Sequence, residues 1–322
     1  MGLQVWSLQG IGEINPGDDL ATIIVEHLTE PLVDGDVVVV TSKVVSKAAG
    51  LATTGDRVSL LDAETDRVVA RRGETSIVRT HAGLTLAAAG IDASNLAAGT
   101  VIPLPPDPDG SARDLRSRLE ALTGVRLAVL ITDTAGRAWR IGQTDIAIGS
   151  AGIAPYLSFD GVEDAYGNVL AVTAPAVADE IAGAADLVAG KLDGQPVVVV
   201  RGLPIEWFDA HDGGASALIR DDDSDLFGLG AREAVLAATA RGGMPRGFPS
   251  AEAGDDLIAL ARAGADLSLA DVSVGADGAL DVRALGVSGA PEAYVEAGAL
   301  AERLRILARA LRQDVVIAVV TD

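Results

Sequence analysis

Three short runs of consecutive apolar residues predict fully buried strands. They are Val37-Val-Val-Val40, Leu127-Ala-Val-Leu-Ile131 and Val197-Val-Val-Val200. Each run is shorter than a typical helix and is rich in β-branched residues, which favour extended backbone. Each also ends abruptly in polar residues, so the sequence predicts strands that carry polar side chains to the edge of a core.

The rest of the first three quarters of the chain predicts further strands and helices by its periodicity. Alternating or mixed apolar patterns predict strands over 3–9, 75–80 and 169–172. Acidic or hydroxyl residues before apolar stripes predict helices over 18–27, 111–122 and 176–192. The polar segment 56–73 predicts a mostly exposed helix.

The pattern changes from about residue 244, where Arg246-Gly-Phe-Pro249 indicates a linker. A helix over 251–263, a hairpin over 267–285 centred on Ala276-Asp-Gly278, a helix over 291–312 and a strand over 315–320 then follow. We therefore predict one domain over residues 1–243 and a small C-terminal α/β module over 244–322. The module shows no recognisable chemistry.

Composition narrows the possible partners. The formal net charge of −21 argues against nucleic acid, which needs a basic face. No run of about 18 uncharged apolar residues and no signal peptide is present, so we expect no membrane contact and a cytoplasmic location. The chain has no cysteine and only three scattered histidines, which disfavours zinc and favours an oxygen-ligated magnesium or manganese ion.

The stretch Ile131-Thr-Asp-Thr-Ala-Gly-Arg-Ala-Trp-Arg140 is the main candidate for a site. Asp133 and Thr134 offer oxygen ligands to a hard cation. Arg137 and Arg140 lie three apart, so they would share a face if the segment were helical, and both suit phosphate or carboxylate. The alternative is a capped turn in which Asp133 pairs with a nearby arginine.

Two further clusters follow predicted secondary structure. Ser42 and Lys47 come after the first valine run and could hold a phosphate; the alternative is a solvated helix start. Asp92 and Asn95 lie three apart in a turn and could serve one ligand, although such residues often bond their own backbone. The chain contains no G-x-x-x-x-G-K-[ST] motif, so any nucleotide is held without a P-loop.

The ordered set of motifs over residues 1 to about 235 resembles the coenzyme F420:L-glutamate ligase family, the gamma-glutamyl ligases of deazaflavin biosynthesis. The matching segments are Pro16-Gly-Asp-Asp-Leu20, Asp34-Gly-Asp-Val-Val-Val-Val-Thr-Ser-Lys-Val-Val-Ser-Lys47, Ala89-Gly-Ile-Asp-Ala-Ser-Asn95, Pro106-Asp-Pro-Asp-Gly-Ser-Ala112, Ile131-Thr-Asp-Thr-Ala-Gly-Arg137, and Ala178-Asp-Glu180 with Val200-Arg-Gly-Leu203. The resemblance implies an α+β fold of two subdomains with mixed sheets that forms an intertwined homodimer. Some relatives carry a fused nitroreductase-like domain, which we do not expect in this tail.

The activity implied by the resemblance is a GTP-dependent amide ligation. L-glutamate would be joined to the side chain of a deazaflavin precursor, and further glutamates would follow through the gamma-carboxyl group. The reaction would proceed through an acyl phosphate and use two magnesium or manganese ions, and it could also use a monovalent cation.

The resemblance also implies roles for single residues. Asp92 and Asp133 would hold one divalent ion and Thr134 a second. The nucleotide would contact Asn95, Ser42, Lys47 and the loop Ile11-Gly12-Glu13-Ile14, which lacks the Leu-Pro pair usual in the family. Lys47 and Arg137, with Asp133, would assist phosphoryl transfer.

Two other functions remain compatible with the residues themselves. One is a different metal-dependent enzyme that transfers phosphoryl groups to a small molecule. The other is a nucleotide-binding protein without catalytic activity.

Overall fold

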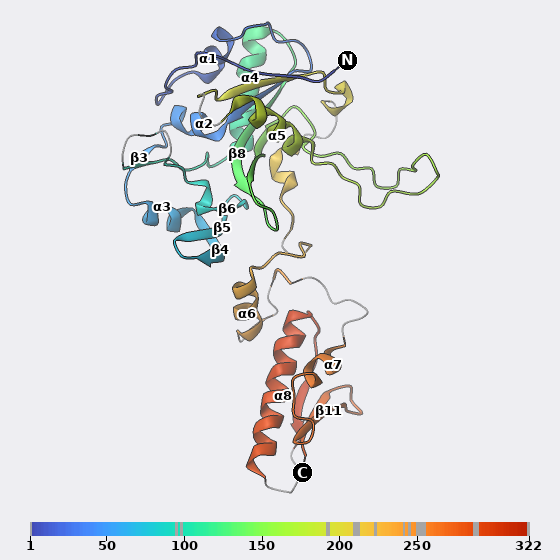
Figure 1. Cartoon of the computed structure of the whole chain (residues 1–322). Coiled ribbons are helices and arrows are strands. Elements are labelled where there is room, and N and C mark those ends of the chain that lie inside the picture. The colour runs from blue at the N-terminus through green and yellow to red at the C-terminus, as the bar shows by residue number, and fades with distance from the viewer. Residues whose placement is uncertain are drawn as a thin grey trace. The chain divides into compact units, whose positions relative to one another are not determined.

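The computed structural model of the chain (Figure 1) describes residues 2–93, 96, 99–190, 194–208, 213–221, 224–240, 242–243, 246–248, 256–285 and 290–320. The chain divides into two compact units, Met1–Ile219 and Arg220–Asp322. Helices and mixed sheets occur together, and the α+β class is confirmed. No helix in the described part of the chain is long and apolar enough to cross a membrane.

A five-stranded mixed sheet forms the centre of the first unit. Its strands are, in spatial order, β1 (Gln4–Ser7), β10 (Val197–Arg201), β2 (Val37–Thr41), β8 (Ala128–Gly136) and β9 (Gln143–Ala151). Only the β2–β8 pair is parallel, and the other neighbours are antiparallel. The three apolar runs of the sequence are therefore the three inner strands.

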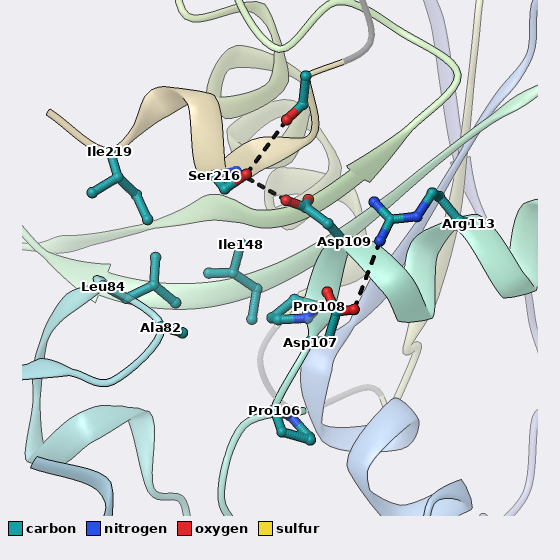
Figure 2. Close-up of a pocket in the computed structure, with 11 residues that line it drawn as sticks. Ala82, Leu84, Pro106, Asp107, Pro108, Asp109, Arg113, Ile148, Ser216 and Ile219 are labelled. Atoms are coloured by element: carbon teal, nitrogen blue, oxygen red, sulfur yellow. Dashed lines mark hydrogen bonds and ion pairs between the residues drawn. The ribbon is translucent and has the colours of Figure 1, made fainter.

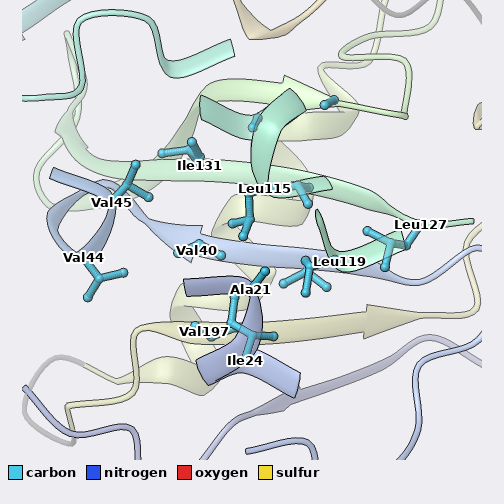
Figure 3. Close-up of a cluster of buried hydrophobic side chains, with 14 of the residues drawn as sticks. Ala21, Ile24, Val40, Val44, Val45, Leu115, Leu119, Leu127, Ile131 and Val197 are labelled. Carbon is cyan, nitrogen blue, oxygen red and sulfur yellow. The ribbon is translucent and has the colours of Figure 1, made fainter. Parts of the chain in front are cut away.

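Both faces of this sheet are covered, which explains why its inner strands are apolar at every position. On one face α1 (Leu20–Glu26) and α4 (Pro108–Thr123) bring Ile24 and Leu119 against Val40 and Ile131 (Figure 3). On the other face α5 (Val177–Ala189) packs against alternate residues of the same strands, including Val39 and Leu130.

Capping residues fix where the two helices on the first face begin and end. Asp19 accepts hydrogen bonds from the amides of Ala21 and Thr22 at the start of α1. Asp107 does the same for Gly110 at the start of α4, where Pro108 occupies the first turn. Gly124 ends α4 in the left-handed conformation, at φ 74°.

A smaller set of elements lies between β2 and α4 in the chain. It comprises α2 (Ser42–Ala48), β3 (Thr53–Thr54), α3 (Arg57–Glu64), β4 (Thr65–Arg72), β5 (Thr75–Thr80), β6 (Thr85–Ala87), η1 (Ala88–Gly90) and β7 (Thr100–Val101). Strands β4, β5 and β6 form one antiparallel sheet, and β3 pairs with β7. The prediction of a single helix over 56–73 is wrong beyond Glu64, because the backbone of 65–72 bonds to β5.

Two further segments complete the first unit. Residues 157–175 form a paired arm that leaves the body of the unit (Figure 1), held by bonds such as Phe159 N to Thr173 O and Leu170 N to Val162 O. After β10 come the short helices η2 (Ile205–Trp207) and η3 (Ala215–Leu218).

The second unit is a three-stranded sheet packed against one long helix. Its elements are α6 (Ala231–Thr239), α7 (Leu257–Arg262), β11 (Ala270–Val274), β12 (Leu280–Ala284), α8 (Pro291–Ala310) and β13 (Ile317–Val320). The strand order is β11-β12-β13, and Leu300 and Leu304 of α8 lie in its core. The predicted hairpin, long helix and final strand are confirmed.

The division between the units falls at residues 219 and 220, earlier than the predicted boundary at 243 and 244. Helix α6 accounts for the difference, because it packs with α8. Arg305 of α8 donates to the carbonyl oxygens of Thr239 and Ala240, and Arg309 donates to that of Ala237. Residues 220–243 therefore group with the C-terminal module.

Candidate active site

The parallel strands β2 and β8 end side by side, and their ends form the candidate site. Their register pairs Val40 with Ile131 and Thr41 with Thr132. At the next position Ser42 Oγ donates to Asp133 Oδ1 over 3.2 Å. Two clusters that lie 91 residues apart in the sequence are thus in direct contact.

Asp133 is a largely buried carboxylate whose pKa is raised to about 7. Burial is the main cause, and the nearby carboxylates of Asp145 and Asp92 add to it, while the hydrogen bond from Ser42 opposes it. The alternative in which Asp133 pairs with an arginine finds no support among the contacts of the described residues. A divalent cation would offset the negative charge gathered here.

Asp145 of β9 is a member of the site that the sequence did not single out. Its carboxylate accepts a hydrogen bond from Thr134 Oγ1 over 2.7 Å and another from Thr132 Oγ1 over 3.1 Å. Thr134 and Asp145 are direct cross-strand partners. No signal in the sequence points to this contact, because it depends on the register of the β8–β9 hairpin.

The alternation of side chains along β8 separates two groups of possible ligands. Asp133 faces Ser42, whereas Thr132 and Thr134 face Asp145. Asp133 and Thr134 therefore lie on opposite faces of one strand. This arrangement suits the expectation that they hold two different ions.

The backbone just before Asp92 is strained. Ala88, Ala89 and Gly90 have φ values of 49°, 55° and 72°, which are unfavourable for the two alanines. Asp92 then pairs with Ile102 through two backbone hydrogen bonds. The expected nucleotide ligand Asn95 lies outside the described residues.

The two clustered lysines each pair with a carboxylate. Lys43 Nζ lies 2.6 Å from Asp92 Oδ2, and Lys47 Nζ lies 2.6 Å from Glu13 Oε1. Ser42 and Lys47 are both buried in α2, so the alternative of a solvated helix start is wrong.

The Lys47–Glu13 contact brings the loop Ile11–Ile14 to α2. Gly12 and Glu13 are exposed, whereas Ile14 is buried in the core and Ile11 packs against it. A ligand could therefore meet the backbone of this loop and the side chain of Glu13, but not the side chain of Ile14.

The two arginines of the main motif lie in the turn between β8 and β9. Arg137 and Arg140 are exposed, and the segment is a hairpin loop instead of the helical turn that would align them. Trp139 between them has a φ of 64°. Arg137 is close to the site in sequence but is not fixed against Asp133 by any contact found among the described residues.

The available donors suit a hard cation that also binds phosphate. Among the described residues no three acidic or histidine side chains converge on one point. One or two carboxylates are the usual protein contribution when the substrate supplies the remaining oxygens to magnesium. Asp133 with Asp92, and Thr134 with Asp145, are two such partial sets.

Comparisons with known proteins agree with this arrangement. A family model described as F420-0:Gamma-glutamyl ligase matches residues 10–202. The coenzyme F420:L-glutamate ligase of Methanothermobacter thermautotrophicus is 38% identical over 252 residues, which cover 70% of this chain and 99% of that protein. The protein of the same name from Methanopyrus kandleri is 39% identical over 239 residues, covering 67% and 93%. That from Methanosarcina acetivorans is 37% identical over 252 residues, covering 72% and 98%.

The matched region of the family contains four of the five strands of the central sheet, all except β1, and the whole candidate site as described. Its limits also agree with the division of the chain, because the match ends before the second unit begins. The chain belongs to the F420-0:gamma-glutamyl ligase family.

Proposed function

We propose that this chain ligates L-glutamate to a precursor of coenzyme F420 in a reaction driven by GTP. Relatives named coenzyme F420:L-glutamate ligase cover two thirds or more of the chain. The observation that carries the proposal is the contact of Ser42 with Asp133 at the joined ends of β2 and β8. It supports the proposal because it joins a carboxylate to a hydroxyl at the start of α2, the helix that also carries Lys43 and Lys47.

The chemistry requires activation, because a carboxylate is a poor electrophile. An oxygen of the acceptor carboxylate attacks the γ-phosphorus of GTP, the bond to the β-phosphate oxygen breaks, and GDP leaves. The amine of glutamate then attacks the acyl carbon, inorganic phosphate leaves, and the amine gives up a proton. The products are an amide, GDP and phosphate.

The residues of the chain would position and neutralise the phosphates. Lys47 offers an ammonium group that Glu13 holds in place, and Ser42 at the start of α2 offers a hydroxyl. Arg137 lies in an exposed hairpin loop and can supply a guanidinium to the transferred group. The loop around Gly12 would approach the nucleotide through its backbone.

Asp133 with Asp92 would hold one magnesium or manganese ion, and Thr134 would hold a second. Bound there, the ions would offset charge on the phosphate oxygens. The raised pKa of Asp133 supports this assignment, since its carboxylate lies in a buried and acidic environment. A monovalent cation remains part of the proposal only through the family resemblance.

We also propose that the protein is a homodimer that uses the arm over residues 157–175. Tyr166 and Val172 on the arm are 91% and 92% exposed, which is unusual for large apolar side chains on a paired segment. A second copy of the chain would bury them.

Mass spectrometry of the deazaflavin precursor tests the proposed function. The precursor is incubated with the protein, GTP, L-glutamate and magnesium or manganese. Mass increments of one or more glutamyl units that require GTP support the proposal. Transfer of phosphate to a small molecule in the absence of glutamate would instead indicate a kinase. GTP binding without any product would indicate a nucleotide-binding protein that has no catalytic activity.

A further inference from the structure

A cavity of about 320 Å³ lies in the first unit at the start of α4 (Figure 2). Polar and apolar atoms contribute about equally to its wall, and one acid–base pair lies at the edge. Its lining includes Leu84, Pro106, Pro108, Ile148 and Ile219, together with Asp107 and Arg113. The size suits a small ring system and not a whole nucleotide.

The cavity lies on the same face of the sheet as Asp133. Ile146 of β9 is the cross-strand partner of Asp133, and Ile148 follows two residues later on the same face of β9. Residues two apart in a strand are separated by about 7 Å. A ligand in the cavity could therefore extend a reactive side chain to Asp133.

Close packing holds the wall of the cavity in place. A Cβ atom added at Gly149 would lie 2.4 Å from the carbonyl oxygen of Pro108, so β9 and the start of α4 are in direct contact. The carboxylate of Asp109 accepts hydrogen bonds from the amides of Ser150, Ala215 and Ser216. Asp109 is thus occupied in joining three segments around the cavity.

The polar edge presents an acceptor next to a donor. Arg113 Nη2 lies 3.7 Å from Asp107 Oδ2, a separation too long for a strong hydrogen bond. A ring edge with an N–H beside a carbonyl would pair with both groups, donating to Asp107 and accepting from Arg113. The apolar walls formed by Leu84, Pro108 and Ile148 would contact the faces of such a ring.

We infer that this cavity binds a planar heteroaromatic ring that carries a hydrogen-bond donor next to an acceptor. The inference rests on the proposed function, in which two substrates have such an edge, the deazaflavin acceptor and the guanine of GTP. The position beside Asp133 and away from the Lys47–Glu13 contact favours the acceptor.

Two variants test the inference by direct binding, without turnover. Arg113→Gln removes the donor at the edge of the cavity. Ala82→Trp places a large side chain at an exposed lining position, where it can fill the cavity without disturbing the core. The dissociation constants of the deazaflavin precursor and of GTP are measured separately by equilibrium dialysis on the full chain.

Each variant has a matched control in the same unit. Arg118→Gln makes the same change on the same helix, and its guanidinium is exposed to 60% against 59% for Arg113 but pairs with Asp19. Ala70→Trp adds the same side chain at an exposed position of β4 that does not line the cavity.

We expect the dissociation constant of one ligand to rise about tenfold in both test variants and in neither control. A rise for the precursor alone identifies the acceptor ring, and a rise for GTP alone identifies guanine. The inference is overturned if neither constant changes, if the controls change equally, or if the wild-type protein binds neither ligand. Failure of the proposed function is separate, because it would appear as binding without glutamyl product.

Discussion

Thr134 donates the hydrogen of its hydroxyl group to Asp145 Oδ1 over 2.7 Å, across the β8–β9 pair. A hydroxyl group has a single hydrogen and two lone pairs. Since the hydrogen is directed to Asp145, a cation bound beside Thr134 would meet the lone pairs of its oxygen and not the hydrogen. Asp145 therefore orients the hydroxyl group of Thr134, a proposed metal ligand, and does not itself need to contact the metal.

Asp145→Asn should weaken metal binding by about tenfold while the protein stays folded, because an amide can no longer accept from both Thr132 and Thr134. Electron paramagnetic resonance of Mn²⁺ in the presence of GTP measures the affinity, and circular dichroism checks the fold. Asp114→Asn, on the outer part of α4, is the control. Unchanged Mn²⁺ affinity in Asp145→Asn would remove Asp145 from the site.

The raised pKa of Asp133 predicts that the free energy of unfolding of the metal-free protein depends on pH. The folded state keeps a proton on Asp133 up to pH about 7, whereas the unfolded chain releases it near 3.8. The folded state therefore binds more protons in this window, and the free energy of unfolding falls as pH rises from about 4 to about 7. The Asp133→Asn variant should not lose stability in this way, because asparagine has no carboxyl group to titrate.

The stability of Asp133→Asn relative to wild type should thus increase by on the order of 3 kcal/mol between pH 4 and pH 8. Urea unfolding followed by tryptophan fluorescence measures it, because all three tryptophans belong to the first unit. Turnover of the same variant should be severely reduced at any pH. A stability difference that does not vary with pH would show that Asp133 is ionised normally.

Arg201 forms a buried ion pair with Asp36 at the opposite end of the β2–β10 pair. Its Nε and Nη2 atoms donate to the two carboxylate oxygens over 2.7 Å each, and the side chain of Asp36 is 0% exposed. Arg201→Gln should cost about 3 kcal/mol in the free energy of unfolding, because it leaves a buried carboxylate without its cation. Urea unfolding by tryptophan fluorescence gives the value.

Arg118→Gln provides the comparison, since its partner Asp19 is 39% exposed and the loss of a surface pair costs less than about 1 kcal/mol. Equal losses in the two variants would mean that burial of Asp36 carries no energetic weight.

Gly149→Ala should destabilise the first unit by about 3 kcal/mol or more, because its Cβ atom would overlap the backbone of Pro108. Gly136→Ala is a matched control on the neighbouring strand, where an added Cβ atom meets nothing within 4 Å. Thermal unfolding of both variants tests the difference. If both tolerate the change, the contact between β9 and the start of α4 is looser than described.

Val172→Asp should shift the protein from dimer to monomer, because a charge on the apolar arm opposes burial against a second copy. Sedimentation velocity measures the change. Val58→Asp, at an exposed apolar position of α3, should leave the oligomeric state as in wild type. A monomeric wild-type protein would dismiss the role proposed for the arm.

The sequence was sufficient where a strand or helix is specified by its own residues. The valine runs predicted the inner strands β2 and β10 correctly, because burial on both faces leaves no polar position. The polar residues that follow β2 and β8 indicated the site, and Ser42 and Asp133 do meet.

Features that depend on pairing between segments were not visible in the sequence. Asp145 looked like one more acid in an acidic chain, and only the hairpin register places it opposite Thr134. The segment 65–72 is polar enough for an exposed helix, but pairing with β5 makes it a strand. Asp109 and Ser111 both stand at the start of the helix predicted over 111–122 and could cap it by residue type, whereas Asp107 caps α4 and Asp109 joins β9 and η3.

The β8–β9 pairing is irregular between Ile131 and Thr132. The strand that follows this point and the loop that follows the strand should differ in how well they tolerate insertions and deletions. Inserting or deleting one residue between this point and Thr134 would exchange the faces on which Asp133 and Thr134 project. Beyond Gly136 the chain only turns, and Gln143 restores the pairing. Natural or designed variants should therefore differ in length at residues 138–142, beyond Arg137, which makes this part of the loop a suitable place to graft a new substrate contact without moving the carboxylate behind it.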